Sequence, residues 1–305
     1  MEEGGFTLVR RRKGGRRAAP RTRAEHSLGD DGDPDAEPEP AEVSRQTARI
    51  DEAVRELRAS ALWRRVRALV PALGAHELVC LGIGSFSSST ASRCQLALAL
   101  LLRDEIQTPS DSGAVDAPAG EARAAMSAYD PVLSALERQC LADAGCALLQ
   151  SNDEGRCVAS VRTLYFMPHC GRQLYSNLLR ANWGREGLQR CAVLGNSFGA
   201  YAAALSDART DAVASWCALA RATCHVEEVN CGAEASSGAG GGRRRSDEVF
   251  DNAFNNLSLH TFAGARLPPD DDAFWARGFD PPPPGDPLAN RDIVASGRGH
   301  AGCCC

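Results

Sequence analysis

Lysine is almost missing from this sequence of 305 residues. Lys13 is the only one, so arginine supplies 33 of the 34 basic side chains. Together with the alanine-rich stretches, this preference for arginine over lysine indicates a biased nucleotide composition of the gene. The number of arginines by itself therefore carries little functional information. The formal net charge of −5 argues against a protein that is basic throughout and coats nucleic acid.

Long hydrophobic segments are also lacking. The longest aliphatic run extends only from Leu96 to Leu102, whereas roughly 18–20 apolar residues are needed to cross a bilayer. The chain opens with Met-Glu-Glu-Gly-Gly and has no apolar stretch behind a basic one, so we expect no secretory signal. The sequence therefore predicts a protein without a membrane span, located in the cytoplasm, with the nucleus as a second location.

No Cys-x-x-Cys pair occurs before the terminal Cys303–Cys305, although the sequence has 13 cysteines. Their odd number and scattered positions argue against a disulfide framework and favour a reducing compartment. Several lie within apolar runs, where a reduced thiol behaves as a small hydrophobic side chain. Three others recur at seven-residue intervals: Cys217, Cys224 and Cys231. This interval fits a helical stripe at least as well as a zinc site, and we predict no metal site.

The first 43 residues are divided into two blocks of charge. Residues 10–23 hold seven arginines and one lysine without an acid, and residues 25–42 hold eight acids without a base. Such segments bury too little apolar surface to fold, so we predict a disordered tail over 1–43. One interpretation of the basic block is a nuclear address or a nucleic-acid contact; the other is a solvated tail without a specific role.

Periodic segments follow this tail. Apolar residues at spacings of three and four predict one amphipathic helix over 44–71. Between 72 and 265, short apolar runs alternate with helical segments, which is typical of a Rossmann-like α/β domain: a parallel sheet with helices on both faces. We interpret 106–124 and 206–248 as insertions in this domain, and the Pro- and Asp-rich residues 266–305 as a second disordered tail.

The ends of the predicted strands supply the candidate site, because ligands of open parallel sheets bind beyond the carboxyl ends of the strands. Eight residues follow four of these strands: Gly82, Gly84, Ser85, Asp130, His169, Cys170, Asn196 and Ser197. The sequence predicts a small-molecule pocket there. A structural turn without a ligand is the competing interpretation.

The glycine turn after the first strand matches no complete cofactor fingerprint. A dinucleotide-binding turn has a third glycine where this chain has Ser87, and a methyl-donor turn has one where Phe86 stands. Asp130 follows Gly84 by 46 residues, or by 27 without the 19-residue insertion, whereas roughly 20 is usual for an acid that binds a ribose hydroxyl. The turn is therefore a weak indication of a nucleotide-like cofactor.

His169 and Cys170 are neighbours at the end of the fourth predicted strand. An imidazole beside a thiol suggests a metal, haem or thiol-nucleophile site. Successive residues of a strand point to opposite faces, so only one of the pair can face a common pocket unless the chain turns there. Alternatively, the histidine simply hydrogen-bonds a backbone group.

Seven short motifs together resemble the sensitivity-to-red-light-reduced (SRR) family. In chain order they are Leu81–Phe86, Ser92–Leu98, Tyr129–Pro131, Phe166–Cys170, Leu178–Trp183, Gly195–Phe198 and Phe254–His260. The resemblance covers 77–205 and 249–263, and 50–70 more weakly. It implies a role in circadian clock regulation and, in animal members, in clock-gene expression and the regulation of haem biosynthesis. It implies no established catalytic residues.

Three classes of function remain. The leading one is a regulator that is either non-enzymatic or binds a small-molecule ligand, with unidentified protein partners; haem is the one cofactor suggested. The alternative is a transferase-type enzyme with a nucleotide-like cofactor held by Gly82, Gly84 and Asp130. The third is a nucleic-acid binder, which rests on residues 10–23 alone.

Overall fold

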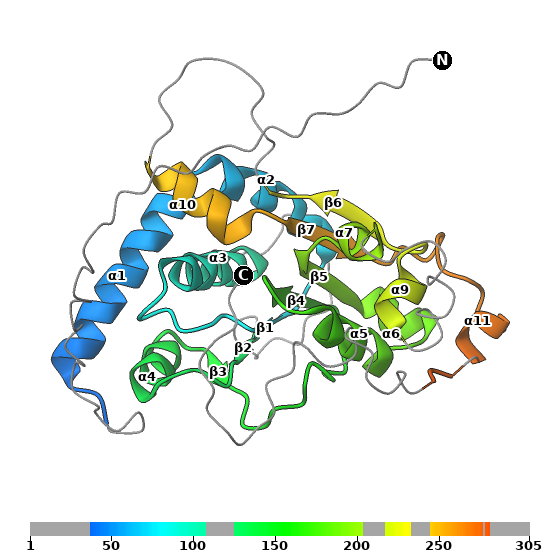
Figure 1. Cartoon of the computed structure of the whole chain (residues 1–305), viewed down its shortest axis with the longest axis horizontal. Coiled ribbons are helices and arrows are strands. Elements are labelled where there is room, and N and C mark those ends of the chain that lie inside the picture. Colours follow the sequence, from blue (N-terminus) through cyan, green and yellow to red (C-terminus); the bar gives the residue numbers. More distant parts are fainter. Residues whose placement is uncertain (1–36, 108–124, 204–216, 233–244, 277, 281–305) are drawn as a thin grey trace, which may run out of the picture. The chain divides into compact units, whose positions relative to one another are not determined.

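Strands and helices alternate along the chain and build a seven-stranded sheet with helices on both faces (Figure 1). This computed structural model describes the chain except for residues 1–36, 108–124, 204–216, 233–244, 277 and 281–305. Most of the predicted N-terminal tail, nearly all of the first predicted insertion and the end of the predicted C-terminal tail therefore lie outside the described residues. All the described residues belong to one folded unit.

The sheet is mixed. Its strands are ordered β3-β2-β1-β4-β5-β7-β6 and have these bounds: β1 Glu77–Leu81, β2 Ala125–Tyr129, β3 Ala147–Leu148, β4 Thr163–Met167, β5 Cys191–Asn196, β6 Glu227–Asn230 and β7 Leu257–Thr261. The pairs among β1 to β5 are parallel, as predicted, but β7 is antiparallel to both β5 and β6. The prediction of a parallel sheet is thus wrong for β7, because the residues of a strand do not encode its direction, which the preceding connection sets.

Alternation along the central strands divides the core in two. Leu164 and Phe166 of β4 face one hydrophobic cluster, and Tyr165 and Met167 face the other. The first cluster is covered by α1 Pro40–Arg58, α2 Ala61–Leu69, α3 Thr90–Gln107, α4 Ala135–Asp143 and α10 Arg245–Phe254. The second is covered by α5 Arg172–Ala181, α6 Arg185–Arg190, α7 Phe198–Ala203 and α9 Ala218–Ala222. Every residue of β4 is buried, which explains its strong apolar signal in the sequence.

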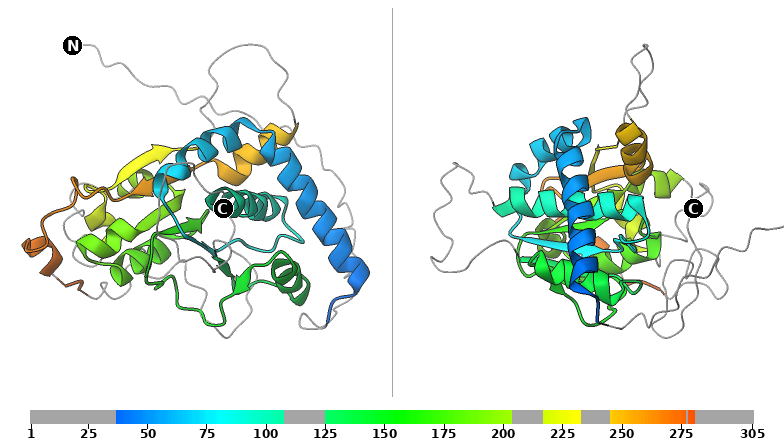
Figure 2. Two further views of the ribbon diagram at one scale, coloured as in Figure 1. Left: turned by 180° about the vertical axis from the view of Figure 1, so that it is seen from behind. Right: turned by 90° about the vertical axis from the view of Figure 1, so that its left-hand side faces the viewer.

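The predicted helix over 44–71 is two helices and a short 3-10 turn, η1 Pro71–Leu73. It breaks at Ala59 and Ser60; Ser60 has extended backbone angles, and its hydroxyl accepts a hydrogen bond from the Trp63 amide at 3.0 Å. Ser60 is therefore the N-cap of α2. Helix α1 begins at Pro40, inside the predicted tail, and crosses α3 and α4 (Figure 2).

The region after β5 contains elements that the sequence pattern did not reveal. Helix α9 and strand β6 lie within the predicted insertion over 206–248. The stretch from Phe250 to Phe262, which in the sequence has strand-like character, begins as the last half of α10 and becomes β7 only at Leu257. Phe250 and Phe254 are spaced by one helical turn and both are buried in the first cluster.

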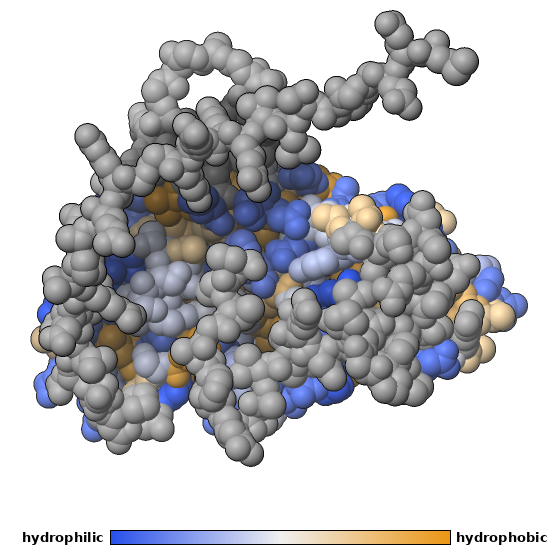
Figure 3. All heavy atoms as spheres, in the orientation of Figure 1, coloured by the Kyte–Doolittle hydropathy of each residue, from blue (hydrophilic) through white to orange (hydrophobic). Residues whose placement is uncertain are grey.

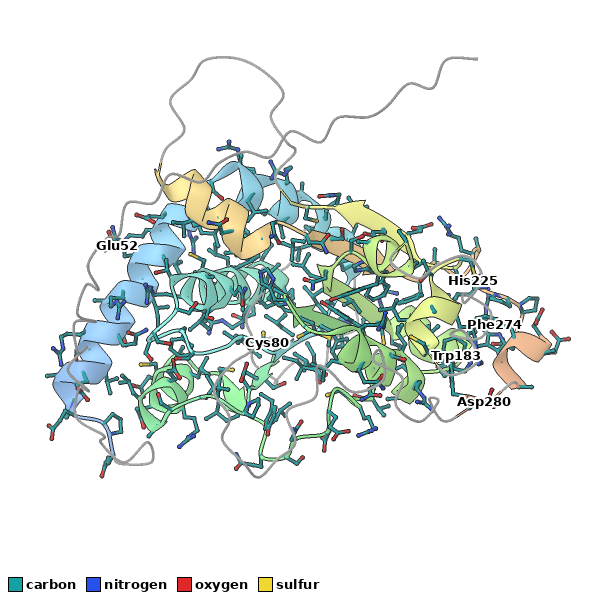
Figure 4. The ribbon with its side chains drawn as sticks, in the orientation of Figure 1. Glu52, Cys80, Trp183, His225, Phe274 and Asp280 are labelled. Carbon is teal, nitrogen blue, oxygen red and sulfur yellow. The ribbon has the colours of Figure 1, made fainter. Side chains whose placement is uncertain are left out.

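The C-terminal tail predicted over 266–305 begins as an ordered segment. We call residues 267–276 and 278–280 the aromatic strap; it contains helix α11 Ala273–Ala276. Three of its rings lie with their centroids 4.8 to 5.6 Å from the Trp183 ring: Phe274, Trp275 and Phe279. In Figure 3 hydrophobic and hydrophilic residues are mixed at the α11 end of the molecule, and Figure 4 shows Trp183, His225 and Phe274 close together there.

Polar contacts also fix the aromatic strap. The Arg185 guanidinium donates a hydrogen bond to the Leu267 carbonyl at 2.7 Å, and the Arg221 guanidinium lies 3.9 Å above the Phe279 ring. Leu267 itself is buried in the second cluster. The sequence of this segment predicts disorder because Pro and Asp dominate its composition. In the structure, a few aromatic side chains nevertheless anchor it to the domain.

Removing residues 266–305 should therefore destabilise the protein, whereas removing only 281–305 should not. Three partly buried aromatic rings stabilise the fold by about 3 kcal/mol, which corresponds to a fall in Tm of about 6–12 °C for a domain of this size. Calorimetric melting of both truncated proteins beside the full chain measures the difference. Equal melting temperatures for all three would show that the aromatic strap contributes nothing.

Candidate functional site

The candidate residues gather at the carboxyl ends of the parallel strands. Strand β1 lies between β2 and β4, and β5 follows β4. From β1 the chain continues to β2 on one side of the sheet and later to β4 on the other side. The strand order therefore reverses between β1 and β4, and ligands of open parallel sheets bind at such a point. The sequence correctly placed the segments that begin at Gly82, Asp130, His169 and Asn196 along this edge.

Gly82 gives room to a side chain of the protein itself. Its φ is +72°, and a Cβ built on it would lie 2.6 Å from the Cys170 sulfur. Cys170 is buried, and its thiol donates a hydrogen bond to the Leu81 carbonyl at 3.3 Å. The space beside Gly82 at the junction of β1 and β4 is thus filled by a thiol from the β4 turn.

Gly84 is bonded to the acid that was predicted to hold a ribose. The Gly84 amide donates to Asp130 Oδ2 at 2.7 Å, and the Val132 amide donates to Asp130 Oδ1 at 3.0 Å. Burial raises the pKa of the Asp130 carboxyl and outweighs the two amide hydrogen bonds, which act in the opposite direction. Asp130 therefore ties the end of β2 to the turn after β1.

Glu137 is a central residue of the site that the sequence did not predict. Its carboxylate is fully buried and accepts hydrogen bonds from the Ser85 hydroxyl at 2.8 Å and the Ser87 amide at 2.7 Å. Its other oxygen accepts from the amide and the hydroxyl of Ser134, the N-cap of α4. The Ser-x-x-Glu spacing of a capping box is the signal that would have found it.

Together, the two carboxylates fill the role that a phosphate has in a nucleotide-binding turn. Free backbone amides at such a turn are what attract a phosphate. Here the Gly84 amide is bonded to Asp130 and the Ser87 amide to Glu137. Two amides of the turn after β1 are thus bonded to the protein's own acids.

His169 has left-handed backbone angles, with φ +55°, so the chain turns at this point. Its side chain is exposed, while that of Cys170 is buried. The His169 amide donates to Asn196 Oδ1 at 2.9 Å, and its Nε2 lies 2.9 Å from the Ala253 carbonyl oxygen, to which it donates. The imidazole therefore bonds to the backbone, as the alternative interpretation proposed.

Asn196 joins the ends of β4 and β5. Besides the His169 amide, its side chain contacts the Tyr201 hydroxyl, to which Nδ2 donates at 2.9 Å. The Asn196 amide donates to the Tyr175 hydroxyl at 2.8 Å, and that hydroxyl donates to the Met167 carbonyl. Burial raises the pKa of the Tyr175 hydroxyl well above its ordinary value, so it stays a neutral donor.

Ser197 caps the short helix α7, since its hydroxyl oxygen accepts from the Ala200 amide at 2.9 Å. Two neighbours were not predicted. The Gly199 amide donates to Glu228 Oε2 at 2.9 Å, and the buried His260 ring stacks on Phe198 with a centroid distance of 3.8 Å. They escaped prediction because β6 and β7 bring them there from distant parts of the chain.

The Glu228 carboxyl is strongly acidic. Burial alone would raise its pKa, but its polar neighbours outweigh this and lower the pKa to about 2: the His260 ring, whose Nε2 lies 3.7 Å from Oε2, the Ser197 hydroxyl and the Gly199 amide. His260 Nδ1 donates to the Val193 carbonyl at 3.0 Å. These groups are thus part of a bonded network at the end of β5.

Metal ligands and membrane-spanning helices are both absent from the described residues. No three His, Cys, Asp or Glu side chains among them gather as metal ligands, and no helix among them has the length and hydrophobicity to cross a membrane. Of the three regularly spaced cysteines, Cys217 and Cys231 are buried and Cys224 is exposed. They lie at the start of α9, after its end and after β6, so they form no single helical stripe.

The strand order and the bonded turn define an α/β protein whose polar edge is closed by its own side chains. Residues 61–261 match the family model of the SRR1 domain, which is more than half of the chain. The chain therefore belongs to the SRR1 domain family, which confirms the resemblance seen in its motifs.

Three relatives show how far the similarity extends. Protein SENSITIVITY TO RED LIGHT REDUCED 1 of Arabidopsis thaliana is 36% identical over 146 residues, 48% of either chain. The SRR1-like protein of Mus musculus is 38% identical over 123 residues, 40% of this chain and 44% of the relative. The SRR1-like protein of Drosophila melanogaster is 28% identical over 203 residues, 66% of this chain and 61% of the relative. The match thus spans about half of the first two relatives, and no solved structure matches the chain significantly.

Replacing Glu137 by glutamine should cost about 2–3 kcal/mol in the free energy of unfolding. The amide nitrogen of glutamine cannot accept hydrogen bonds, so one pair of buried donors, at Ser85 and Ser87 or at Ser134, loses its partner. Urea unfolding at neutral pH measures the loss. Glu186→Gln is the matched control, because this glutamate is exposed and forms a surface ion pair with Arg190. An equal effect of both substitutions would contradict the role of Glu137.

Proposed function

We propose that this chain is a regulatory protein that acts in light- and clock-linked control of gene expression, including that of haem biosynthesis. Membership of the SRR1 domain family supports a regulatory role. The Arabidopsis relative is named for a reduced sensitivity to red light. Because the match covers about half of that relative, its function is carried over here only as a proposal. The cytoplasm or the nucleus is the location that this function requires.

The bonded turn is the observation that favours a regulator over an enzyme. Asp130 and Glu137 hold the amides of the turn, and Cys170 fills the space beside Gly82. A cofactor site keeps such donors free for its ligand, whereas a surface that binds a protein partner needs a fixed shape. The turn after β1 has the properties of such a surface.

His169 and Cys170 do not fit a haem site as a pair. The thiol is buried and bonded to the Leu81 carbonyl, while the imidazole is exposed and bonded to the Ala253 carbonyl. An axial ligand has to reach the iron from one pocket. We therefore propose that the link to haem biosynthesis runs through gene expression and protein partners. Contact with nucleic acid through residues 10–23 lies outside the described residues and stays a prediction.

The regulatory role predicts rescue in mouse cells that lack the SRR1-like protein. Expression of this chain should restore the rhythm of a clock-gene reporter and the transcript levels of haem-biosynthesis enzymes. The double variant Asp130→Ala, Glu137→Ala, compared at equal protein level, should restore neither, because the turn loses its support. Glu186→Ala is the surface control and should rescue fully. No rescue by the wild-type chain at normal expression would contradict the proposal.

A transferase is the second candidate, and the topology is what favours it. The first five strands have the order of the dinucleotide-binding folds. With the reversed β7 between β5 and β6, the sheet has the strand order of many S-adenosylmethionine-dependent transferases. Fold alone does not establish function, however. The closed turn is the observation against this candidate.

Calorimetric titration separates the two candidates. With the turn closed by Asp130 and Glu137, the full chain should give no saturable heat with S-adenosylmethionine or with NADH. Asp130→Asn is the control for the cofactor site, since it keeps the size of the side chain and removes its charge. Saturable binding by the wild type that is lost in Asp130→Asn would favour the transferase and overturn the assignment of the turn as a partner surface.

A further inference from the structure

A groove of about 360 Å³ lies between α1, α3 and α10, on the face of the sheet covered by the first cluster. Eight residues line it: Arg49, Glu52, Ala53, Glu56, Thr90, Arg93, Cys94 and Val249. Those of α1 follow one another at helical spacing, so they share one face of the helix. Glu52 on α1 is labelled in Figure 4. None of the groove's lining residues is one of the candidate residues at the carboxyl ends of the strands.

Two guanidinium groups converge at one end of this groove. Arg93 is only 9% exposed; it donates to the Phe86 carbonyl at 2.9 Å and to the Thr90 hydroxyl at 3.1 Å. Arg49 donates to the Ser87 carbonyl at 3.3 Å and to Gln46 Oε1 at 3.2 Å. Neither arginine forms an ion pair with Glu52 or Glu56, the two carboxylates that line the groove. Burial and the charge of Arg49 both lower the pKa of Arg93.

A buried cation that forms no close ion pair with the acids around it is costly, and the charge of Arg49 further disfavours that of Arg93. Each guanidinium has five N–H donors in a planar fork that matches phosphate and carboxylate groups. Arg93 uses only two of them in the bonds above. An anionic group between Arg49 and Arg93 would therefore supply a close counter-charge and further acceptors for their N–H groups.

The remaining charges of the groove have the opposite sign. Glu52 and Glu56 are exposed residues of α1 and lie three and seven positions after Arg49. At a rise of about 1.5 Å per residue, this places them roughly 5 and 10 Å further along the helix axis. The groove is thus positive at the Arg49 end and negative at the Glu56 end. A molecule with anionic groups alone matches only one half of it.

We infer that this groove binds a small zwitterionic molecule. Its phosphate or carboxylate group lies between Arg49 and Arg93, and its amino group faces Glu52 and Glu56. The Thr90 hydroxyl, at the first turn of α3, is a further polar contact at the anionic end. This inference does not depend on the proposed regulatory function, since it uses other residues.

Phosphoethanolamine and inorganic phosphate are the probes that test it, titrated calorimetrically into the full chain at constant ionic strength. The wild type should bind phosphoethanolamine more tightly than phosphate, because only the former has an amino group. Arg49→Gln should weaken both by about tenfold or more, which is the usual loss for a hydrogen bond to a charged group. Arg45→Gln is the matched control on the same helix: Arg45 is exposed, does not line the groove and should bind as wild type.

The double variant Glu52→Gln, Glu56→Gln gives a test of opposite sign. It should weaken phosphoethanolamine, which loses the partners of its amino group, and strengthen phosphate, which is no longer repelled. This arm keeps both arginines, so it stays informative even if Arg49→Gln lowers the stability. The inference is overturned if phosphoethanolamine shows no saturable binding in the millimolar range. It is equally overturned if Arg45→Gln weakens binding as much as Arg49→Gln, or if the double variant moves both probes in the same direction.

Discussion

The turn after β1 depends on two acids, the fully buried Glu137 and the half-buried Asp130. Burying a carboxylate is costly unless hydrogen-bond donors replace the water that it loses. Asp130 is bonded to two backbone amides, and Glu137 to two amides and two hydroxyls. These bonds join the ends of β1 and β2 to the start of α4. The geometry of the whole polar edge follows from this arrangement, since Cys170 and the β4 turn lie directly against it.

The same turn is also held from its other side. Phe86 and Ser87 offer their carbonyl groups to Arg93 and Arg49, while the Ser87 amide is bonded to Glu137. The backbone between these residues therefore connects the groove of the first cluster with the carboxyl ends of the strands. A ligand that binds the two arginines would therefore change their hydrogen bonds to the Phe86 and Ser87 carbonyls, which belong to the proposed partner surface. These hydrogen bonds link the two sites directly.

The residues that match the family model and the elements outside this match lie in different parts of the chain. The SRR1 domain match runs from 61 to 261. It includes the sheet and the closed turn, but leaves out α1, which forms one wall of the groove, and the aromatic strap. The strap lies on the opposite face of the sheet, anchored at Trp183 and Arg221. Helix α1 and the aromatic strap, which lie outside the family match, thus pack against the first and the second hydrophobic cluster respectively.

The sequence by itself determined the elements whose signal is local. The fully apolar run of β4, the Gly turn after β1 and the polar residues at the strand ends were all visible in it, because burial on both faces and positive φ angles restrict the residue types directly. The seven motifs likewise identified the family, since each of them is a short run of neighbouring residues.

Only the tertiary structure decided what those residues do. The direction of β7, the order of the aromatic strap and the occupation of the turn by Glu137 all rest on contacts between distant segments. A strand does not encode its direction, and a Pro-rich segment becomes ordered when a few rings find a partner such as Trp183. Whether an amide is free for a ligand depends on which side chain the fold brings to it. The pattern around Gly84 therefore predicted where a site would lie, and the half-buried carboxylate of Asp130 and the buried one of Glu137 occupy two of its amides.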